Sequence, residues 1–227
     1  MKVGEMRTRL HSHRNALDLL EQVPAYKPLW TEIKDAIETL TDERLIDYFE
    51  HNFQGKAVKS LSRTINNLLD EELVAAEWVP QSQIFGASDY GTHTWRLDFA
   101  KQFDVLEMDE KDQPKSIRTG ISIEVAFNHQ GNIAWNLLKP VIASEINHVE
   151  KNLQTSLGIV IAATDELKAA GGFDNAVGTY EQFVSNLLPL RNFLTVPVLV
   201  IGLEAPETFR ISHEKSGNQT FGFVDRF

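Results

Sequence analysis

Two long apolar segments, 157-LGIVIAAT-164 and 196-VPVLVIGLE-204, constrain the fold more than any other feature of the sequence. Each is a continuous run rich in β-branched residues, which is typical of a strand buried on both faces of a sheet. Between them, 164-TDELKAAGG-172 and 179-TYEQFVSNLLPLRNF-193 have helical spacing. Strand, helix and strand of these lengths predict a right-handed crossover onto a parallel strand pair. We therefore expect a parallel sheet with helices packed on it.

A second set of strands precedes this unit. Three segments alternate apolar and polar residues as half-buried strands do: 95-WRLDFA-100, 103-FDVLEM-108 and 117-IRTGISIEVAF-127. The segment 109-DEKDQPK-115 is predicted to be the hairpin turn between the last two. Residues 133–153 are predicted to be helical on either side of Pro140, which should kink or divide the helix.

The two ends of the chain have different character. Residues 1–80 show helical periodicity, residues 81–94 are predicted to be a loop, and residues 205–227 are polar and loop-rich, with at most one short hairpin. The sequence predicts an α/β (α+β mixed) fold with a central mixed β-sheet flanked by helices. We expect one domain over 1–227, divided into a helical N-terminal part (1–80), a core (95–204) and a C-terminal tail (205–227).

Composition excludes several classes of protein. The 227 residues include no cysteine, so disulfides and thiolate zinc sites are excluded. No run of about 18 apolar residues is present, and the first residues lack the apolar core of a signal peptide, so we expect a cytoplasmic protein without membrane contact. The net charge of −10 by itself disfavours a nucleic-acid partner. One basic cleft can nevertheless exist on an acidic protein.

The strand around Glu124 carries the chemistry that we predict. A single glutamate on such a strand is ordinarily solvent-facing. If the hairpin turns near Pro114, however, Asp104 lies opposite Glu124, and their Cβ atoms should be roughly 5 Å apart. Two carboxylates that close repel each other unless a cation lies between them, and oxygen ligands favour Mg²⁺. A solvated pair and a slipped register remain alternatives.

Such a site supports phosphodiester hydrolysis. A bound divalent ion polarises a phosphate oxygen, lowers the pKa of a bound water and stabilises the departing oxyanion. A third group commonly positions the attacking water. By strand alternation it would be residue 126, which lies two residues after Glu124 on the same face.

The order Asp, hairpin, Glu-x-x resembles the metal site of PD-(D/E)xK nucleases, and 121-ISIEVAFNH-129 resembles the catalytic strand of the BglII/BstYI-like group of type II restriction endonucleases. Asn66 followed by 70-DEEL-73, and then Trp78, resembles a helical segment of that group. The segments 180-YEQ-182 and 197-PVLVIGL-203 resemble its crossover helix and last core strand. The resemblance covers roughly residues 60–204 and implies a restriction-endonuclease-like sheet.

The resemblance implies a role for individual residues. Asp104 and Glu124 would bind Mg²⁺, and Glu72 would be a further acidic member of the site. Asn128, His129 and Gln130 would enter the major groove of double-stranded DNA, where Asn and Gln can read adenine. The tail would add base or phosphate contacts through Arg210, His213, Lys215, Asn218 and Gln219. The family is dimeric because a two-fold protein reads a palindrome, which here is expected to contain GATC.

Position 126 departs from the family pattern. Ala126 stands where the relatives have Gln and other nucleases have Lys or Glu, and a methyl group cannot hydrogen-bond to water. Three explanations compete: another group such as Lys101 substitutes, the site relies on metal and phosphate alone, or the chain is a crippled variant, which is the explanation we favour. Loss of such an orienting group typically lowers the reaction rate by about 10²- to 10⁴-fold.

The main hypothesis is therefore a magnesium-dependent, homodimeric type II restriction endonuclease whose activity Ala126 puts in doubt. The first alternative is a sequence-specific DNA-binding protein on a decayed nuclease fold. The second is a small-molecule enzyme or an interaction module in which Asp104 and Glu124 are ordinary surface acids.

Overall fold

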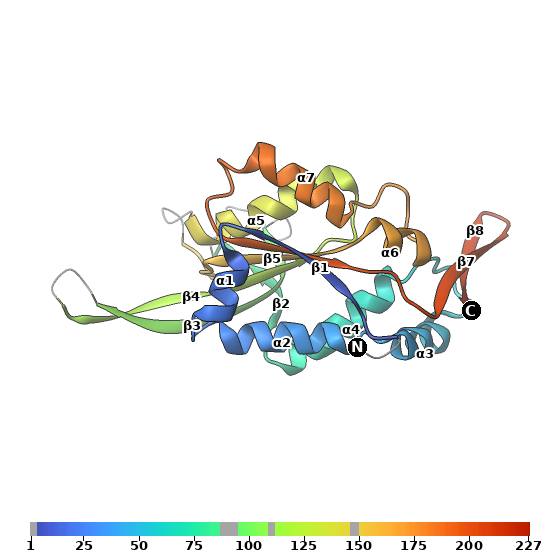
Figure 1. The fold of residues 1–227 in the computed structure, drawn as a ribbon, viewed down its shortest axis with the longest axis horizontal. Coiled ribbons are helices and arrows are strands. Elements are labelled where there is room, and N and C mark those ends of the chain that lie inside the picture. The colour runs from blue at the N-terminus through green and yellow to red at the C-terminus, as the bar shows by residue number, and fades with distance from the viewer. Residues whose placement is uncertain (1–3, 87–94, 109–111, 146–149) are drawn as a thin grey trace.

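A computed structural model describes residues 4–86, 95–108, 112–145 and 150–227 of the chain. A six-stranded mixed sheet with strand order β1-β6-β5-β4-β3-β2 forms its centre, as Figure 1 shows. The strands are β1 (Thr8–His13), β2 (Val79–Gln83), β3 (Arg96–Met108), β4 (Pro114–Val125), β5 (Leu157–Ala163) and β6 (Val198–Leu203). Strands β4, β5 and β6 are parallel, whereas β1, β2 and β3 join antiparallel. The expected mixed sheet flanked by helices is confirmed.

Two layers of helices cover the sheet (Figure 1). One layer contains α1 (Ala16–Gln22), α2 (Lys27–Glu38), α3 (Asp42–Phe53) and α4 (Ser62–Ala75). The other contains α5 (Ile133–Glu145), which follows the short 3-10 turn η2 (Gln130–Asn132), and α7 (Tyr180–Leu190). The helix α6 (Asp165–Ala170) lies between β5 and α7 in the chain. The last two strands, β7 (Phe209–Ser216) and β8 (Gln219–Arg226), form a separate hairpin.

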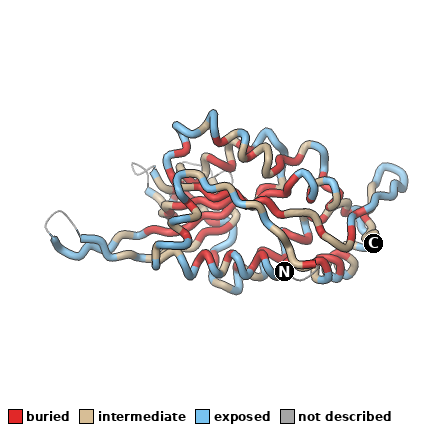
Figure 2. The backbone as a smooth tube through the Cα atoms, viewed as in Figure 1, coloured by how far each residue is buried: buried red, intermediate tan, exposed pale blue. Residues whose placement is uncertain are grey.

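The central strands are buried on both faces, as the continuous apolar segments predict. Every residue of β5 and β6 is buried. Alternate residues divide between two apolar clusters: Ile159 and Ile161 face the layer of α1 to α4, whereas Val160 and Ala162 face α5 and α7. Figure 2 shows this buried centre, with exposed chain at the periphery.

Local sequence signals set several helix boundaries. Helix α3 begins after Thr41, whose side chain accepts a hydrogen bond from the Arg44 amide at 3.3 Å. Helix α6 begins in the same way after Thr164, which accepts from the Leu167 amide at 3.2 Å. Each cap satisfies an amide that the first turn of a helix leaves without a partner. Pro140 lies inside α5 without dividing the described part of that helix. Residues 150–153, which were also predicted to be helical, are not, and residues 146–149 are outside the described residues.

Two strands were not predicted. Strand β1 lies in the part expected to be helical and pairs with β6 along the edge of the sheet. Strand β2 covers the last two residues of the part expected to be helical and the first three of the expected loop 81–94, of which residues 87–94 are outside the described residues. Pro80 fits there because β2 is an edge strand. The tail is more regular than expected, since β7 and β8 pair over eight residues each.

Strands β3 and β4 form one long hairpin whose distal part projects from the body of the sheet as an arm (Figure 1). The segments 95–100 and 103–108, which were predicted to be separate strands, are continuous in β3. Part of the predicted turn, residues 109–111, is outside the described residues. No helix in the described part of the chain is long and apolar enough to cross a bilayer.

Candidate active site

The register of the β3–β4 hairpin decides which acid lies opposite Glu124. Phe99 pairs with Ile123, and the next step of the ladder places Asp98 opposite Glu124. Asp98 is held there by the Val125 amide, which donates to its Oδ2 at 2.7 Å. Directly opposed side chains have Cβ atoms roughly 5 Å apart. Two carboxylates therefore meet where β3 enters and β4 leaves the sheet.

The expected partner of Glu124, Asp104, lies elsewhere, so this prediction is wrong in register. Asp104 pairs with Arg118 in the ladder and forms a two-pronged ion pair with it at 2.9 and 3.0 Å on the exposed arm. Six residues of strand separate Asp104 from Asp98, a distance of roughly 20 Å. The hairpin does not fold about Pro114, because Pro114 is already in β4 opposite Met108. A proline is tolerated at the first residue of a strand, so it does not have to lie in the turn.

Glu124 is buried rather than solvent-facing, with 2% of the residue exposed. Burial and then the nearby charge of Asp98 raise its pKa to about 8. Burial also raises the pKa of Asp98, although the Val125 amide opposes that shift. The two acids therefore repel each other in a site of low dielectric constant, and a positive partner would relieve this repulsion.

One positive partner comes from α5. The Lys139 ammonium donates to Glu124 Oε2 at 2.7 Å, and only 13% of the lysine side chain is exposed. The other carboxylate oxygen, Oε1, is buried and has no hydrogen-bond partner in the described part of the chain. A buried oxygen without a donor is costly unless another group binds it.

A cavity of about 340 Å³ opens on Asp98. It is lined by residues of α4, β2, β3 and β4: Asn66, Asn67, Asp70, Gln81, Asp98, Phe99 and Val125. Gln81 donates to Asp98 Oδ1 at a long 3.4 Å. Asp70 is thus a second acid on the cavity wall beside Asp98, and it comes from the helical segment that resembles the family.

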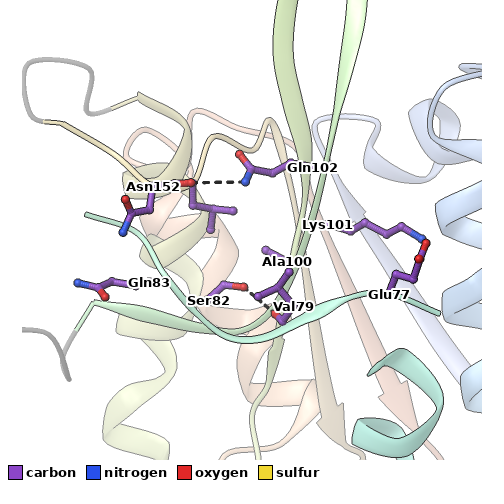
Figure 3. Close-up of a pocket in the computed structure, with 9 residues that line it drawn as sticks. Glu77, Val79, Ser82, Gln83, Ala100, Lys101, Gln102 and Asn152 are labelled. Carbon is purple, nitrogen blue, oxygen red and sulfur yellow. Dashed lines mark hydrogen bonds between the residues drawn. The ribbon is translucent and has the colours of Figure 1, made fainter. Parts of the chain in front are cut away.

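A second cavity, of about 460 Å³, lies further along the same hairpin and is shown in Figure 3. It is lined by residues that include Ser82, Lys101 and Asn152, and Gln102 donates to the Asn152 carbonyl at 3.5 Å. Among the described residues, Glu77 is the single acid on its wall. The cavity beside Asp98 is therefore the better candidate for ion-dependent chemistry.

The arrangement of Asp98 and Glu124 fits a divalent cation. Opposed carboxylates and an unpartnered buried oxygen are what an oxygen-ligated ion would satisfy, and Mg²⁺ usually keeps several waters in addition to one or two carboxylates. Among the described residues, no cluster of three or more acidic, histidine or cysteine side chains has the geometry of a metal site. The protein would thus supply two carboxylates, and water and phosphate would complete the ligand set.

Glu72 does not belong to this site. Its carboxylate accepts from Arg44 at 2.7 Å, and it does not line the cavity beside Asp98. Asp70 lines that cavity although it is only two residues earlier, because residues two apart on a helix point in different directions.

Ala126 is on the same face of β4 as Glu124, as alternation predicts, and 1% of it is exposed. Its methyl group lies in the apolar cluster that includes Leu137 and Val160. Lys101, the residue suggested as a substitute, faces the opposite layer: its ammonium donates to both carboxylate oxygens of Glu32 at 2.9 Å and to the Ala76 carbonyl at 2.7 Å. Of the three explanations for Ala126, the one in which Lys101 substitutes for the third group is therefore contradicted.

The predicted DNA-contacting residues lie in two places. Asn128, His129 and Gln130 are exposed directly after Ala126 and Phe127. Their side chains are braced by hydrogen bonds from Asn136 to Asn128, from the Gly131 amide to His129 and from Gln182 to Gln130. This loop therefore leaves the sheet a few residues beyond Glu124.

The tail residues lie on the β7–β8 hairpin, at the opposite end of the molecule from the β3–β4 arm (Figure 1). Arg210 is paired with Asp225 at 2.9 Å, and His213 contacts the Lys59 carbonyl at 2.7 Å. Lys215, Asn218 and Gln219 are exposed near the tip of that hairpin. Within the described part of the chain, no hydrogen bond or ion pair is found between this tip and Asp98 or Glu124.

Three residues of the candidate site were not predicted from the sequence: Asp98, Asp70 and Lys139. A polar residue inside an apolar strand was the signal for Asp98, as it was for Glu124, but the misplaced turn paired Glu124 with the wrong acid. Asp70 belongs to the acidic run 70-DEE-72, in which sequence alone does not separate the cavity residue from the solvated ones. Lys139 could not be found, because its contact depends on how α5 crosses the sheet.

Comparison with solved structures identifies the fold. A crystal structure of the restriction endonuclease BglII complexed with a DNA 16-mer superimposes with a TM-score of 0.58 and 17% sequence identity, covering 98% of this chain and 100% of that chain. Free BglII gives a TM-score of 0.46 and 14% identity over the same shares of the two chains. No curated protein sequence matches the chain significantly. The fold is thus that of a restriction endonuclease.

The family follows from the sequence itself. The profile of the family described as restriction endonuclease BglII/BglIII matches residues 8–203. The chain belongs to the BglII/BglIII restriction endonuclease family.

Proposed function

We propose that this chain is a type II restriction endonuclease that hydrolyses phosphodiester bonds within a short palindromic site in double-stranded DNA and requires Mg²⁺. The observation that carries the proposal is the opposed pair Asp98 and Glu124, with Glu124 Oε1 buried and unpartnered beside it. In this proposal, Asp98 takes the metal-binding role that was predicted for Asp104. Membership of the BglII/BglIII family and the likeness to BglII with DNA support the substrate class.

The residues of the chain prepare the reaction. Asp98 and Glu124 would bind the ion, and the Val125 amide fixes the Asp98 carboxylate before the ion arrives. The burial of Glu124 places its carboxylate in surroundings of low dielectric constant, which strengthens its electrostatic interactions. A bound Mg²⁺ would polarise a phosphate oxygen, lower the pKa of a water and stabilise the departing oxyanion.

The DNA is expected to contact the loop that follows the catalytic strand. Asn128, His129 and Gln130 are exposed and follow Glu124 within six residues, so a duplex that they touch has its backbone near the carboxylates. Asn and Gln side chains can read adenine in the major groove. A homodimer would apply two such sites to the two strands of a palindrome, and we keep the GATC core and the cytoplasmic location as predictions.

Plasmid cleavage tests the proposal. Purified protein with Mg²⁺ should cut plasmid into discrete fragments, and chelation with EDTA should abolish cleavage. Asp98→Asn and Glu124→Gln should each lower the rate by at least about 10²-fold. Asp104→Asn is the matched control and should cut like the parent chain, since Asp104 is paired with Arg118 on the exposed arm. Cleavage that survives Asp98→Asn but not Asp104→Asn would contradict the assignment.

The sequence of the fragment ends identifies the site and tests the loop. With Ca²⁺ in place of Mg²⁺, Gln130→Ala should weaken binding to that duplex by about 1–3 kcal/mol relative to a scrambled duplex. Asn132→Ala, on the same exposed loop, is the control and should leave the difference unchanged.

A DNA-binding protein without nuclease activity is the second candidate, and the burial of Ala126 in an apolar cluster favours it. That protein would retard the duplex in a gel with Mg²⁺ present and leave it uncut.

A further inference from the structure

The face of β4 that carries Glu124 lacks a polar group at its next position. The side chain of Ala126 points to the same face and is enclosed by apolar residues that include Leu137 of α5 and Val160 of β5. An additional polar group on this side of the carboxylates must therefore come from another element. Among the described residues, Lys139 is the cation that forms an ion pair with Glu124.

The position of Lys139 is fixed by the residue that follows it. Pro140 lies against Gly158 of β5, so closely that a Cβ on Gly158 would be 2.5 Å from the Pro140 Cβ. Gly158 is two residues before Val160, which pairs with Glu124 across the parallel ladder. Because this glycine lets α5 approach the sheet, the lysine is held beside the strand that carries the glutamate.

Hydrogen bonds anchor α5, the helix that carries Lys139, near both of its ends. At its start, Asn136 donates to Asn128 Oδ1 at 3.2 Å, and near its end the Lys151 ammonium donates to the Ala143 and Ser144 carbonyls at 2.8 and 3.1 Å. With α5 anchored in this way, the Lys139 ammonium binds Glu124 Oε2 while Oε1 remains without a hydrogen bond. One oxygen is thereby held and the other is left for a ligand.

We propose that Lys139 is the third polar group of the site, supplied by α5 in place of a side chain at position 126. It is a positioning residue that acts through Glu124: its hydrogen bond to Oε2 holds the carboxylate so that Oε1 can bind the ion. This inference rests on the proposed nuclease function, because it names the group that compensates for Ala126. It also replaces the explanation that the chain is crippled.

A double-mutant cycle tests the contact without any need for activity. Lys139→Met leaves a buried acid without its partner and should lower the Tm by several degrees. The double variant Lys139→Met with Glu124→Gln should recover most of that loss, because neither group then requires a charged partner. Lys151→Met is the control: its effect on the Tm should add to that of Glu124→Gln. Additive effects for Lys139 as well would overturn the proposed contact.

Single-turnover cleavage tests the role. Lys139→Met should lower the rate constant by about 10²-fold or more while DNA affinity, measured with Ca²⁺, stays within about twofold. Lys139→Arg should recover at least about tenfold of that loss, and Lys151→Met should cut at the parent rate once folded. A parent rate for Lys139→Met, a parallel loss of DNA affinity, or no recovery with arginine would overturn the inference alone. No cleavage by the parent chain would overturn the proposed function and the inference together.

Discussion

Pro140 of α5 rests on Gly158 of β5, and this contact brings the helix close enough for Lys139 to bind Glu124. A glycine on β5 thus affects the ion pair of a glutamate on the neighbouring strand β4. It makes the packing of α5 a condition for the function that we propose.

Gly158→Ala should therefore impair both stability and cleavage. The added Cβ would lie 2.5 Å from Pro140, so α5 must shift away from the sheet. Overpacking of this kind typically costs about 1–3 kcal/mol of unfolding free energy. Urea denaturation measures the cost, and single-turnover cleavage should slow because Lys139 moves with the helix. An unchanged Tm and rate would show that α5 is not held by this contact.

The buried glutamate predicts how stability depends on pH. The pKa of Glu124 is raised to about 8 from its ordinary value near 4.5, so the folded state favours the protonated acid. A raised pKa stabilises the folded protein at low pH, and that stabilisation is lost as pH rises from about 5 through 8. With EDTA present, the unfolding free energy should fall over this window, and in Glu124→Gln the fall should be smaller. An equal pH dependence in the parent chain and in Glu124→Gln would contradict the raised pKa of Glu124.

The same ionisation should govern cleavage. A divalent ion binds the ionised carboxylate, so the cleavage rate at a fixed, subsaturating Mg²⁺ concentration should rise through the same range of pH. Saturating Mg²⁺ should move the rise to lower pH, because the ion competes with the proton. A rate that is independent of pH between 6 and 9 at low Mg²⁺ would be inconsistent with Glu124 as a ligand.

Restoring glutamine at position 126 should not raise activity. Ala126 is enclosed in an apolar cluster, so Ala126→Gln would bury an amide without a partner and add volume, at a cost of about 1–3 kcal/mol. Ala126→Val adds volume without polarity and separates the two causes. Cleavage rates and Tm values of both variants measure the effect. A rate increase of 10²-fold for Ala126→Gln would instead favour the crippled-variant explanation.

Asp70 and Glu72 offer a matched comparison on one helix. Asp70 lines the cavity beside Asp98, whereas Glu72 is paired with Arg44 at 2.7 Å. Asp70→Asn should raise the Mg²⁺ concentration needed for half-maximal cleavage, because it removes negative charge from the wall of the site. Glu72→Gln should leave that concentration within about twofold. The reverse order of effects would restore Glu72 as the further acidic member.

Local pattern was sufficient for much of the architecture. The apolar runs that form β5 and β6 predicted buried parallel strands, because a strand that is covered on both faces has apolar residues at consecutive positions. The strand around Glu124 and the resemblance of its neighbours placed the chain in the correct family. Strand β1 was missed, since six residues with mixed polarity become a strand through pairing with β6 and not through their own pattern.

What the sequence determined by itself was therefore the class of fold and the family, and it also indicated one acid of the candidate site, because these depend on the order and periodicity of residues along the chain. Tertiary structure alone decided which acid lies opposite Glu124 and which cation lies beside it. The first depends on a hairpin register that a small displacement of the turn changes completely. The second depends on the height of α5 above the sheet, which the missing side chain of Gly158 sets.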